Sequence, residues 1–316
     1  MLVRREELKE LMKRKLMAGG LHEDHADQTA EVLTWSSERG LHSHGEVRVE
    51  YYTERIYKGG INVDPKWSWE QTGPCTGVVD GDNGCGYPFA ILGLEGDLCC
   101  LTMCQSDPMV IPYGGAEPFY GTNPIAFGAP TADERFVNFD MATTVQAWGK
   151  ILDAKSAGHL IPDDWAVDVE GNPVTDPHKV NALRAIAGPK GYGLMMMVDI
   201  LSGVLLGVPS GKNVSSMYHD LSEGCDLGHL HIVIDPSRFV GLEEFKEQMS
   251  QTLDELGAVR PAPGYDKVYY PGERALIRKA KCDAAGGIEI VDSIYDYLVS
   301  DKLWIHDWDH RNRFAE

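Results

Sequence analysis

The spacing of apolar residues changes at about residue 60, and this change constrains the fold more than any other feature of the sequence. Before residue 60, leucines and methionines recur every three or four residues, as on one face of a helix (Leu8, Leu11, Met12, Leu16). After it, short apolar runs of strand length alternate with clusters of Gly, Pro and Asp. The pattern therefore predicts an α/β chain with an N-terminal helical cap and a main lobe that contains a sheet.

Within this outline the expected elements can be placed by residue number. In the cap we expect one helix that ends at Gly19 and Gly20, a second from about residue 23, and a third over residues 43–57. In the lobe, residues 77–79, 98–103, 125–127, 136–139 and 229–235 predict strands, and residues 192–206 and 242–256 predict helices. The predicted domains are residues 1–60, which we expect to pack with residues 260–316, and residues 61–260.

Composition and charge restrict the class of protein. With 316 residues, the chain is long enough for a large core. Its net charge of −19 argues against nucleic acid and anionic membranes as partners, whereas a small anionic substrate needs only one or two local cations. The N-terminus is too polar for a signal peptide, and the seven scattered cysteines favour buried thiols in a reducing cytoplasm over a disulfide framework.

The usual fingerprints of nucleotide binding are missing. G-x-G-x-x-G does not occur, and Pro88 interrupts any helix that would start after Gly84 and Gly86. Residues 207–213 resemble a P-loop but have the wrong spacing. The sequence therefore does not predict a Rossmann fold.

The segment 42–52 carries the clearest chemical pattern. On a helix, His44, Arg48 and Tyr52 would lie four residues apart and share one face. Such a face suits a 2-hydroxy or 2-oxo acid, because Arg binds a carboxylate while His or Tyr bonds or deprotonates the hydroxyl. The alternative is a solvated helix face held by salt bridges with nearby Glu and Arg side chains.

Two further features concern anion and metal binding. Residues 188–193 precede an apolar helix whose N-terminus, with Lys190, could bind an anion, although an ordinary loop before a helix explains the same residues. The pairs His42/His44 and His229/His231 have no Cys or carboxylate at a usual metal-ligand spacing, so we expect no metal site.

These features coincide with a known family. The sequence resembles the malate/L-lactate dehydrogenase type 2 family, which is unrelated to the Rossmann lactate and malate dehydrogenases. The resemblance covers nearly the whole chain. The matching stretches are residues 42–45, 48–52, 71–75, 103–110, 120–124, 139–150, 187–207, 214–218 and 268–272.

The resemblance implies an α/β fold in which a mixed-sheet lobe binds NAD, with NADP as the alternative, without G-x-G-x-x-G. It also implies a homodimer with the active site between cap and lobe, and oxidation of a small 2-hydroxy acid, most specifically (S)-ureidoglycolate to oxalurate in purine-nitrogen catabolism. The site residues it implies are Ser43, Arg48 and Tyr52 for the substrate, and Ser106, Asp140, Met141, Ala142, Lys190, Gly272, Glu273 and Arg274 for the cofactor.

One departure from the family concerns the general base. The resemblance implies that a Gly-His-Ser-Gly turn, whose histidine accepts the proton, stands before the strand at 98–103. This chain is shortened there, around residues 86–98, and has no histidine between His44 and His159. His44 therefore becomes the candidate catalytic base. The alternatives are a dehydrogenase of malate, lactate or sulfolactate, or a homologue that is catalytically impaired.

Overall fold

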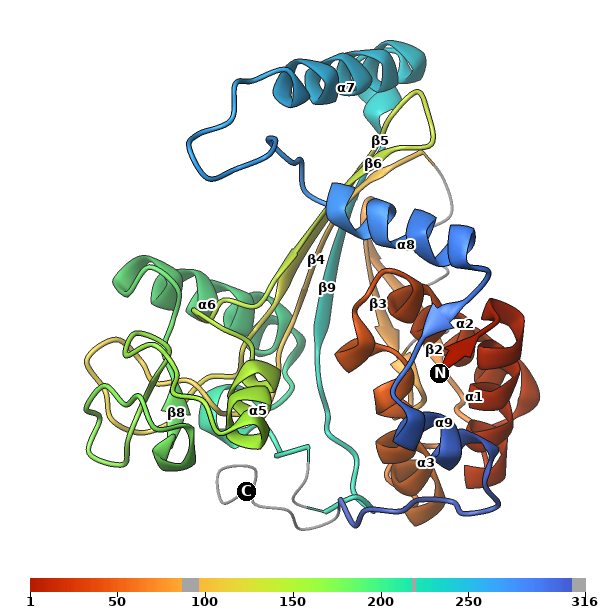
Figure 1. The fold of residues 1–316 in the computed structure, drawn as a ribbon, viewed down its shortest axis with the longest axis vertical. Helices are drawn as coiled ribbons and strands as arrows, with labels where there is room; N and C mark the ends of the chain where they lie inside the picture. Colours follow the sequence, from red (N-terminus) through yellow and green to blue (C-terminus); the bar gives the residue numbers. More distant parts are fainter. Residues whose placement is uncertain (87–96, 218–219, 309–316) are drawn as a thin grey trace. The chain divides into compact units, whose positions relative to one another are not determined.

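The computed structural model describes residues 1–86, 97–217 and 220–308. The chain divides into two compact units (Figure 1). Unit 1 comprises Met1–Gly96, Asp220–Gly224 and Glu273–Arg311, and unit 2 comprises Asp97–His219, Cys225–Gly272 and Asn312–Glu316. These bounds group residues 61–86 with the N-terminal helices and residues 225–272 with the sheet, whereas the domain boundaries expected above remain a prediction.

Three helices form the N-terminal part of unit 1: α1 (Arg5–Gly19), α2 (Glu23–Glu38) and α3 (Val49–Lys58). The apolar stripe seen in the sequence lies inside, because Leu8, Met12 and Leu16 of α1 are fully buried. Two glycines with positive φ, Gly20 and Gly59, end α1 and α3. The predicted end of the first helix is thereby confirmed.

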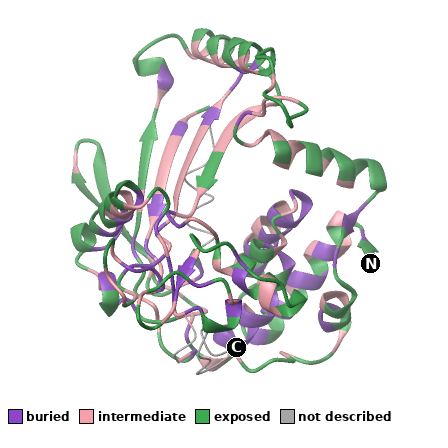
Figure 2. Cartoon of the chain, turned by 60° about the vertical axis from the view of Figure 1, so that its left-hand side comes forward, coloured by how far each residue is buried: buried purple, intermediate pink, exposed green. Residues whose placement is uncertain are grey.

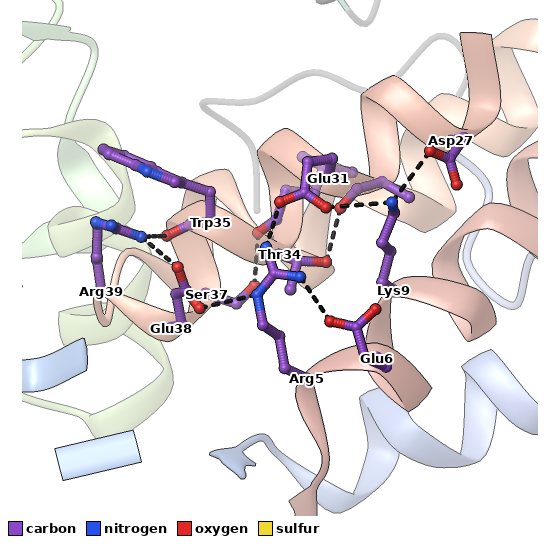
Figure 3. A network of polar contacts seen from close by, with 12 residues as sticks. Arg5, Glu6, Lys9, Asp27, Glu31, Thr34, Trp35, Ser37, Glu38 and Arg39 are labelled. Atoms are coloured by element: carbon purple, nitrogen blue, oxygen red, sulfur yellow. Dashed lines mark hydrogen bonds and ion pairs between the residues drawn. The ribbon is translucent and has the colours of Figure 1, made fainter. Parts of the chain in front are cut away.

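A charged network joins α1 and α2 along their edge (Figure 3). Arg5 Nε donates to Glu38 Oε2 over 3.1 Å and the Arg5 side chain also contacts Glu31. Lys9 Nζ donates to Asp27 Oδ2 over 3.0 Å. Because Glu38 is buried, its bonds to Arg5 and Arg39 compensate for its removal from water.

The C-terminal part of unit 1 packs into the same core. It contains α8 (Glu273–Ala285), β10 (Ile288–Glu289) and α9 (Asp292–Val299), and β10 pairs with β1 (Leu2–Val3). Tyr297 and Leu298 of α9 are buried in the cluster that holds Leu8 and Leu16. Unit 1 also holds an antiparallel hairpin of β2 (Ser68–Gly73) and β3 (Thr76–Asp80), whose residues are mostly exposed.

A four-stranded sheet forms the centre of unit 2. Its strand order is β6 (Phe136–Met141), β5 (Ile125–Pro130), β4 (Cys99–Cys104) and β9 (His229–Ile234), and every pair is antiparallel. A Rossmann fold needs parallel strands joined by helical crossovers, so this sheet is of another kind. Figure 2 shows mostly intermediate exposure along β4, β5 and β6, whereas β9 is mostly exposed.

Helices α5 (Trp148–Ala157), α6 (Pro189–Ser202) and α7 (Leu242–Gly257) also belong to unit 2. A second core, with Ile151, Leu183 and Met195 fully buried, lies between α5, α6 and the short pair β7 (Ala166–Val167) and β8 (Ala182–Leu183). None of the helices in the described parts of the chain has the length and apolar character needed to cross a membrane.

The α/β class and the five predicted strands are confirmed, but two helix predictions are wrong. The helix expected to continue to residue 206 ends at Ser202, and Val204–Leu206 forms a separate 3-10 turn. The helix ends before Gly203, whose backbone lies directly against the side chain of Gln105. A Cβ atom at this position would lie only 2.0 Å from Gln105 Nε2, so only a glycine fits there. The helix expected from residue 43 begins only at Val49.

Candidate functional site

The predicted substrate residues lie on two 3-10 turns in unit 1, His42–His44 and Glu46–Arg48, followed directly by α3. His44, Arg48 and Tyr52 therefore do not share one α-helical face, which corrects the expectation. Gly45 separates the turns with φ −112° and ψ −132°, and a Cβ atom on it would lie 2.2 Å from Ser37 Oγ. The close approach of this glycine to α2 prevents a continuous helix.

The turns nevertheless bring Ser43, His44 and Arg48 together. Ser43 Oγ and His44 Nδ1 are 3.0 Å apart, and Arg48 Nε donates to the Ser43 carbonyl oxygen over 2.7 Å. Arg48 has helical backbone angles and caps α3, so Tyr52 follows it by one turn on the same side. Ser43 and His44 are exposed, whereas Tyr52 is half-buried against the core of unit 1.

Among the predicted cofactor residues, Ser106 lies in a compact polar cluster in unit 2. Its Oγ accepts a 2.8 Å bond from the Thr122 amide, and its own amide donates to Asn123 Oδ1 over 3.2 Å. Asn123 is fully buried and its Nδ2 donates to the Met195 carbonyl of α6 over 3.2 Å. Thr143 Oγ1 donates to the Thr122 carbonyl over 2.8 Å. Ser106 is thereby fixed to both the 122–143 region and α6.

Lys190 lies in the first turn of α6 and is exposed. The residue before the helix, Gly188, has φ +59° and supplies no side-chain cap to the first amides. The amides of a first helical turn carry partial positive charge, and Lys190 adds a full one. Lysine and helix terminus together could hold an anionic group.

Asp140 lies on β6, where the register defines its neighbours across the sheet. Asp140 pairs with Ala126, Ala126 with Thr102, and Thr102 with His231. Directly paired side chains point to the same face, so Asp140 and His231 share a face with two small or polar residues between them. Thr102 Oγ1 and His231 Nδ1 are 3.1 Å apart.

From the sequence, the histidines of β9 are candidates only for metal binding, and this placement is not predicted. His229 and His231 stack with their ring centres 6.2 Å apart. Both side chains are exposed at their surface, but desolvation by the surrounding protein atoms lowers the pKa of both, and for His229 the neighbouring His231 adds to the effect. Partial burial, followed by the charge of Asp140, raises the pKa of Cys104 to about 12. The i, i+2 spacing of the histidines, with Asp140 on another strand, was the available signal.

Gly272 lies beside β6 as well. The Pro271 carbonyl accepts a 3.0 Å bond from the Asn138 amide, and Gly272 has φ +99° with space for no more than a hydrogen toward Asn138. Met141 and Ala142 follow Asp140 directly. Glu273 and Arg274 begin α8, which belongs to unit 1. The structure thus brings Gly272 close to the Asp140 strand.

The described residues contain no cluster of three or more His, Cys, Asp or Glu side chains arranged to hold a metal ion. All seven cysteines fall in the described parts of the chain, and none of them forms a disulfide.

Comparison with known proteins identifies clear relatives. The sequence pattern of the family described as malate/L-lactate dehydrogenase matches residues 3–95 and 92–299. The chain is 49% identical to the ureidoglycolate dehydrogenase (NAD(+)) of Escherichia coli (strain K12), over 100% of both chains. The structure matches sulfolactate dehydrogenase from Methanocaldococcus jannaschii with a TM-score of 0.85, 31% identity, and coverage of 94% of this chain and 95% of the other. It matches malate dehydrogenase from Pyrococcus horikoshii OT3 with a TM-score of 0.82, 30% identity, and coverage of 94% and 93%.

The comparisons also reveal a difference in length. The alignment with the E. coli enzyme has 350 positions, 34 more than the residues of this chain. The two segments that match the family pattern meet at residues 92–95. This overlap falls within residues 86–98, where we expect the chain to be shortened; that shortening stays a prediction, and residues 92–95 lie outside the described residues.

Proposed function

The chain belongs to the malate/L-lactate dehydrogenase family, and from this premise we propose that it oxidises (S)-ureidoglycolate to oxalurate with NAD as the hydride acceptor. The observation that carries the proposal is the 49% identity to a ureidoglycolate dehydrogenase (NAD(+)) over the full length of both chains. The other matched enzymes, 31% and 30% identical, are named for sulfolactate and malate. All three substrates are 2-hydroxy acids, so the proposed reaction type is shared.

The residues of unit 2 fit NAD. The N-terminus of α6 with exposed Lys190 suits a phosphate of the cofactor, since it offers uncapped amides and a cation. Gly272 packs closely against the backbone of Asn138, where a Cβ atom would lie 3.0 Å from the amide nitrogen, and this contact holds it beside β6. We propose Ser106, Asp140, Met141 and Ala142 as the remaining cofactor contacts of unit 2. Glu273 and Arg274, which begin α8 of unit 1, are proposed from the family resemblance alone.

On the substrate side, we propose that Arg48 binds the carboxylate. The bond from its Nε to the Ser43 carbonyl orients the guanidinium plane, and a planar guanidinium can bind a carboxylate through two parallel hydrogen bonds. Ser43 and Tyr52 then contribute hydroxyl groups to the polar end of the substrate. A lysine could not reproduce the two parallel bonds.

We propose His44 as the group that accepts the hydroxyl proton. When His44 Nδ1 carries a hydrogen and donates it to Ser43 Oγ, 3.0 Å away, Nε2 becomes the nitrogen that can accept a proton. NAD, when bound, supplies the acceptor for the hydride that leaves the hydroxyl-bearing carbon. The O–H electrons form the carbonyl bond as His44 takes the proton, so charge and atoms balance.

Turnover of several substrates tests the proposal. The purified chain is given NAD with ureidoglycolate, malate, lactate or sulfolactate, and NADH absorbance is followed. We expect kcat/KM for ureidoglycolate to exceed the others by at least about tenfold, because a site that bonds a polar substituent discriminates against substrates without it. A larger kcat/KM for another acid would assign the chain to that substrate instead.

The role of His44 is tested by His44→Ala. Removal of a positioned base costs about 10²–10⁴-fold in rate, so kcat should fall by this amount. His178, an exposed histidine of unit 2, provides the control, and His178→Ala should keep the parent rate. An unchanged rate in His44→Ala would exclude it as the base.

The 34 alignment positions without a residue in this chain favour a second candidate, a protein that binds NAD but turns substrate over poorly. This candidate predicts NAD binding in calorimetry together with the absence of NADH formation on all four acids.

We further propose a cytoplasmic homodimer, as the cysteine content and the family resemblance suggest, and light scattering of the purified chain measures its mass.

A further inference from the structure

A buried carboxylate, that of Glu46, lies beneath the turns that carry the proposed substrate residues. Its side chain is 1% exposed. Glu46 Oε2 accepts a 2.6 Å bond from Ser37 Oγ of α2, and Oε1 is 2.8 Å from His42 Nδ1. The Glu46 amide in turn donates to Ser37 Oγ over 3.2 Å. The residue is therefore bonded both to α2 and to the preceding turn.

The contacts of Glu46 link the two turns that carry the proposed substrate residues. His42 begins the first 3-10 turn, which ends at His44, and Glu46 begins the second, which ends at Arg48. The Glu46–His42 contact joins the starts of the turns, and the bond from Arg48 to the Ser43 carbonyl joins their later parts. Each turn of three residues has few bonds of its own, so these side-chain bonds define its orientation.

We propose that Glu46 is a positioning residue for this site: its carboxylate fixes the two turns to α2 and thereby sets the orientation of His44 and Arg48. The inference rests on the proposed function, because it assigns those two residues to the substrate. Glu46 itself is too buried to touch a ligand. It acts through Ser37 and His42.

The charges around His42 add a pH dependence. Glu46 from the second turn and Glu289 from β10 favour its protonated form, while burial and Arg278 from α8 oppose it. The hydrogen bond to Glu46 dominates and raises the pKa of His42 above its ordinary value of 6.5. Once His42 loses its proton, Glu46 keeps a buried charge without a cation beside it, and its hold on the turn weakens. Substrate affinity should then fall as the pH rises through the raised pKa.

Three variants separate positioning from general stability. Glu46→Ala removes both side-chain bonds, and Glu46→Gln retains the shape and an acceptor oxygen but no charge. Glu38→Gln is the matched control, since Glu38 is an equally buried carboxylate of unit 1, bonded to Arg5 and Arg39 instead of the turns (Figure 3). Kinetics are measured below the unfolding temperature of each variant, across the pH range of histidine titration.

We expect kcat/KM for ureidoglycolate to fall by about 10–100-fold in Glu46→Ala, as for loss of a hydrogen bond to a charged group. Glu46→Gln should recover part of this loss, and its KM should no longer rise with pH as that of the parent does, because a glutamine carries no charge that the protonated His42 has to balance. Glu38→Gln should lower the unfolding temperature but keep the parent KM and pH profile. If both Glu46 variants match Glu38→Gln in KM, kcat and pH profile, the inference is wrong.

Nuclear magnetic resonance of the histidine rings tests the positioning role of Glu46 independently of turnover. In Glu46→Gln the His42 ring should titrate at lower pH, and the His44 ring signal should shift because its turn moves. A His44 signal identical to that of the parent would overturn the inference. A parent chain without turnover would instead contradict only the proposed function, since the ring signals would still report on Glu46.

Discussion

Arg48 Nε donates a 2.7 Å hydrogen bond to the carbonyl oxygen of Ser43, and this bond ties the proposed carboxylate-binding group to the turn that holds the proposed base. It spans Gly45, where the backbone leaves helical geometry. Helical spacing therefore does not bring Arg48 to Ser43. Two short turns folded against α2 bring them together, and this contact orients the Arg48 guanidinium before any substrate arrives.

Arg48→Lys should weaken substrate binding although it keeps the positive charge. A lysine has neither the fixed Nε donor to Ser43 nor two parallel donors for a carboxylate, so kcat/KM should fall by about 10–100-fold. Steady-state kinetics with ureidoglycolate measures the change. Arg238→Lys, on an exposed arginine of unit 2, is the control and should leave kcat/KM as in the parent. Equal values for Arg48→Lys and the parent would exclude bidentate binding at Arg48.

Asn123→Leu should destabilise unit 2 and weaken NAD binding together. The fully buried amide bonds the Ser106 amide and the Met195 carbonyl, and its φ of +35° suits Asn better than Leu. Loss of buried partners costs about 1–3 kcal/mol in the free energy of unfolding. Urea unfolding and calorimetry with NAD measure the two effects. Asn172→Leu, at an exposed position, should change both little, and unaltered NAD affinity in Asn123→Leu would separate Asn123 from the cofactor site.

Much of the fold could be predicted because local sequence determines it. The strand at His229–Ile234 is a run of apolar and alternating residues, and α1 has an apolar stripe that ends at two glycines. Such signals involve neighbours in the chain only. The family resemblance likewise pointed to an α/β lobe without a Rossmann motif, which the antiparallel sheet confirms.

The errors arose where contacts between distant residues decide the local geometry. Helical periodicity predicts a helix from residue 43, but the backbone at Gly45 packs against α2 and the helix is interrupted there. A Cβ atom on Gly45 would lie only 2.2 Å from Ser37 Oγ. Glu46 was not recognised because nothing in the sequence shows its burial. That Asp140 and His231 share one face of the sheet depends on strand register, which pairs residues far apart in the chain.

The stability of unit 2 should decrease as the pH falls through the histidine range. Desolvation by the surrounding protein atoms depresses the pKa of His229 and of His231 below 6.5 in the folded chain. The unfolded chain therefore takes up protons first, so this stability is present above pH 6.5 and is lost as the pH falls through the depressed values. His42 acts with the opposite sign, because its raised pKa gives stability at low pH that is lost on alkalinisation.

The difference between the parent and the double variant His229→Gln/His231→Asn isolates the effect of β9, since His42 is common to both. Urea midpoints are compared on either side of pH 6.5. The double variant should lose less stability than the parent on acidification, and His178→Gln should lose as much as the parent. Parallel curves for the parent and the double variant would show that these two histidines do not couple to folding.

Gly121→Ala should disturb the cofactor side without changing any charge. A Cβ atom at Gly121 would lie 2.1 Å from the Ser106 carbonyl oxygen and 2.2 Å from its Oγ, so Ser106 would have to move. Since Ser106 is bonded to Thr122 and Asn123, the movement breaks a packed cluster, and we expect NAD affinity to fall by at least about tenfold with a loss of about 1–3 kcal/mol in stability.

Gly149→Ala is the matched control, because a Cβ there meets nothing within 4 Å and the residue lies in α5. That variant should bind NAD as the parent does and gain roughly 0.5–1 kcal/mol from its helix propensity. If the two variants bind NAD equally well, Ser106 is not a cofactor contact.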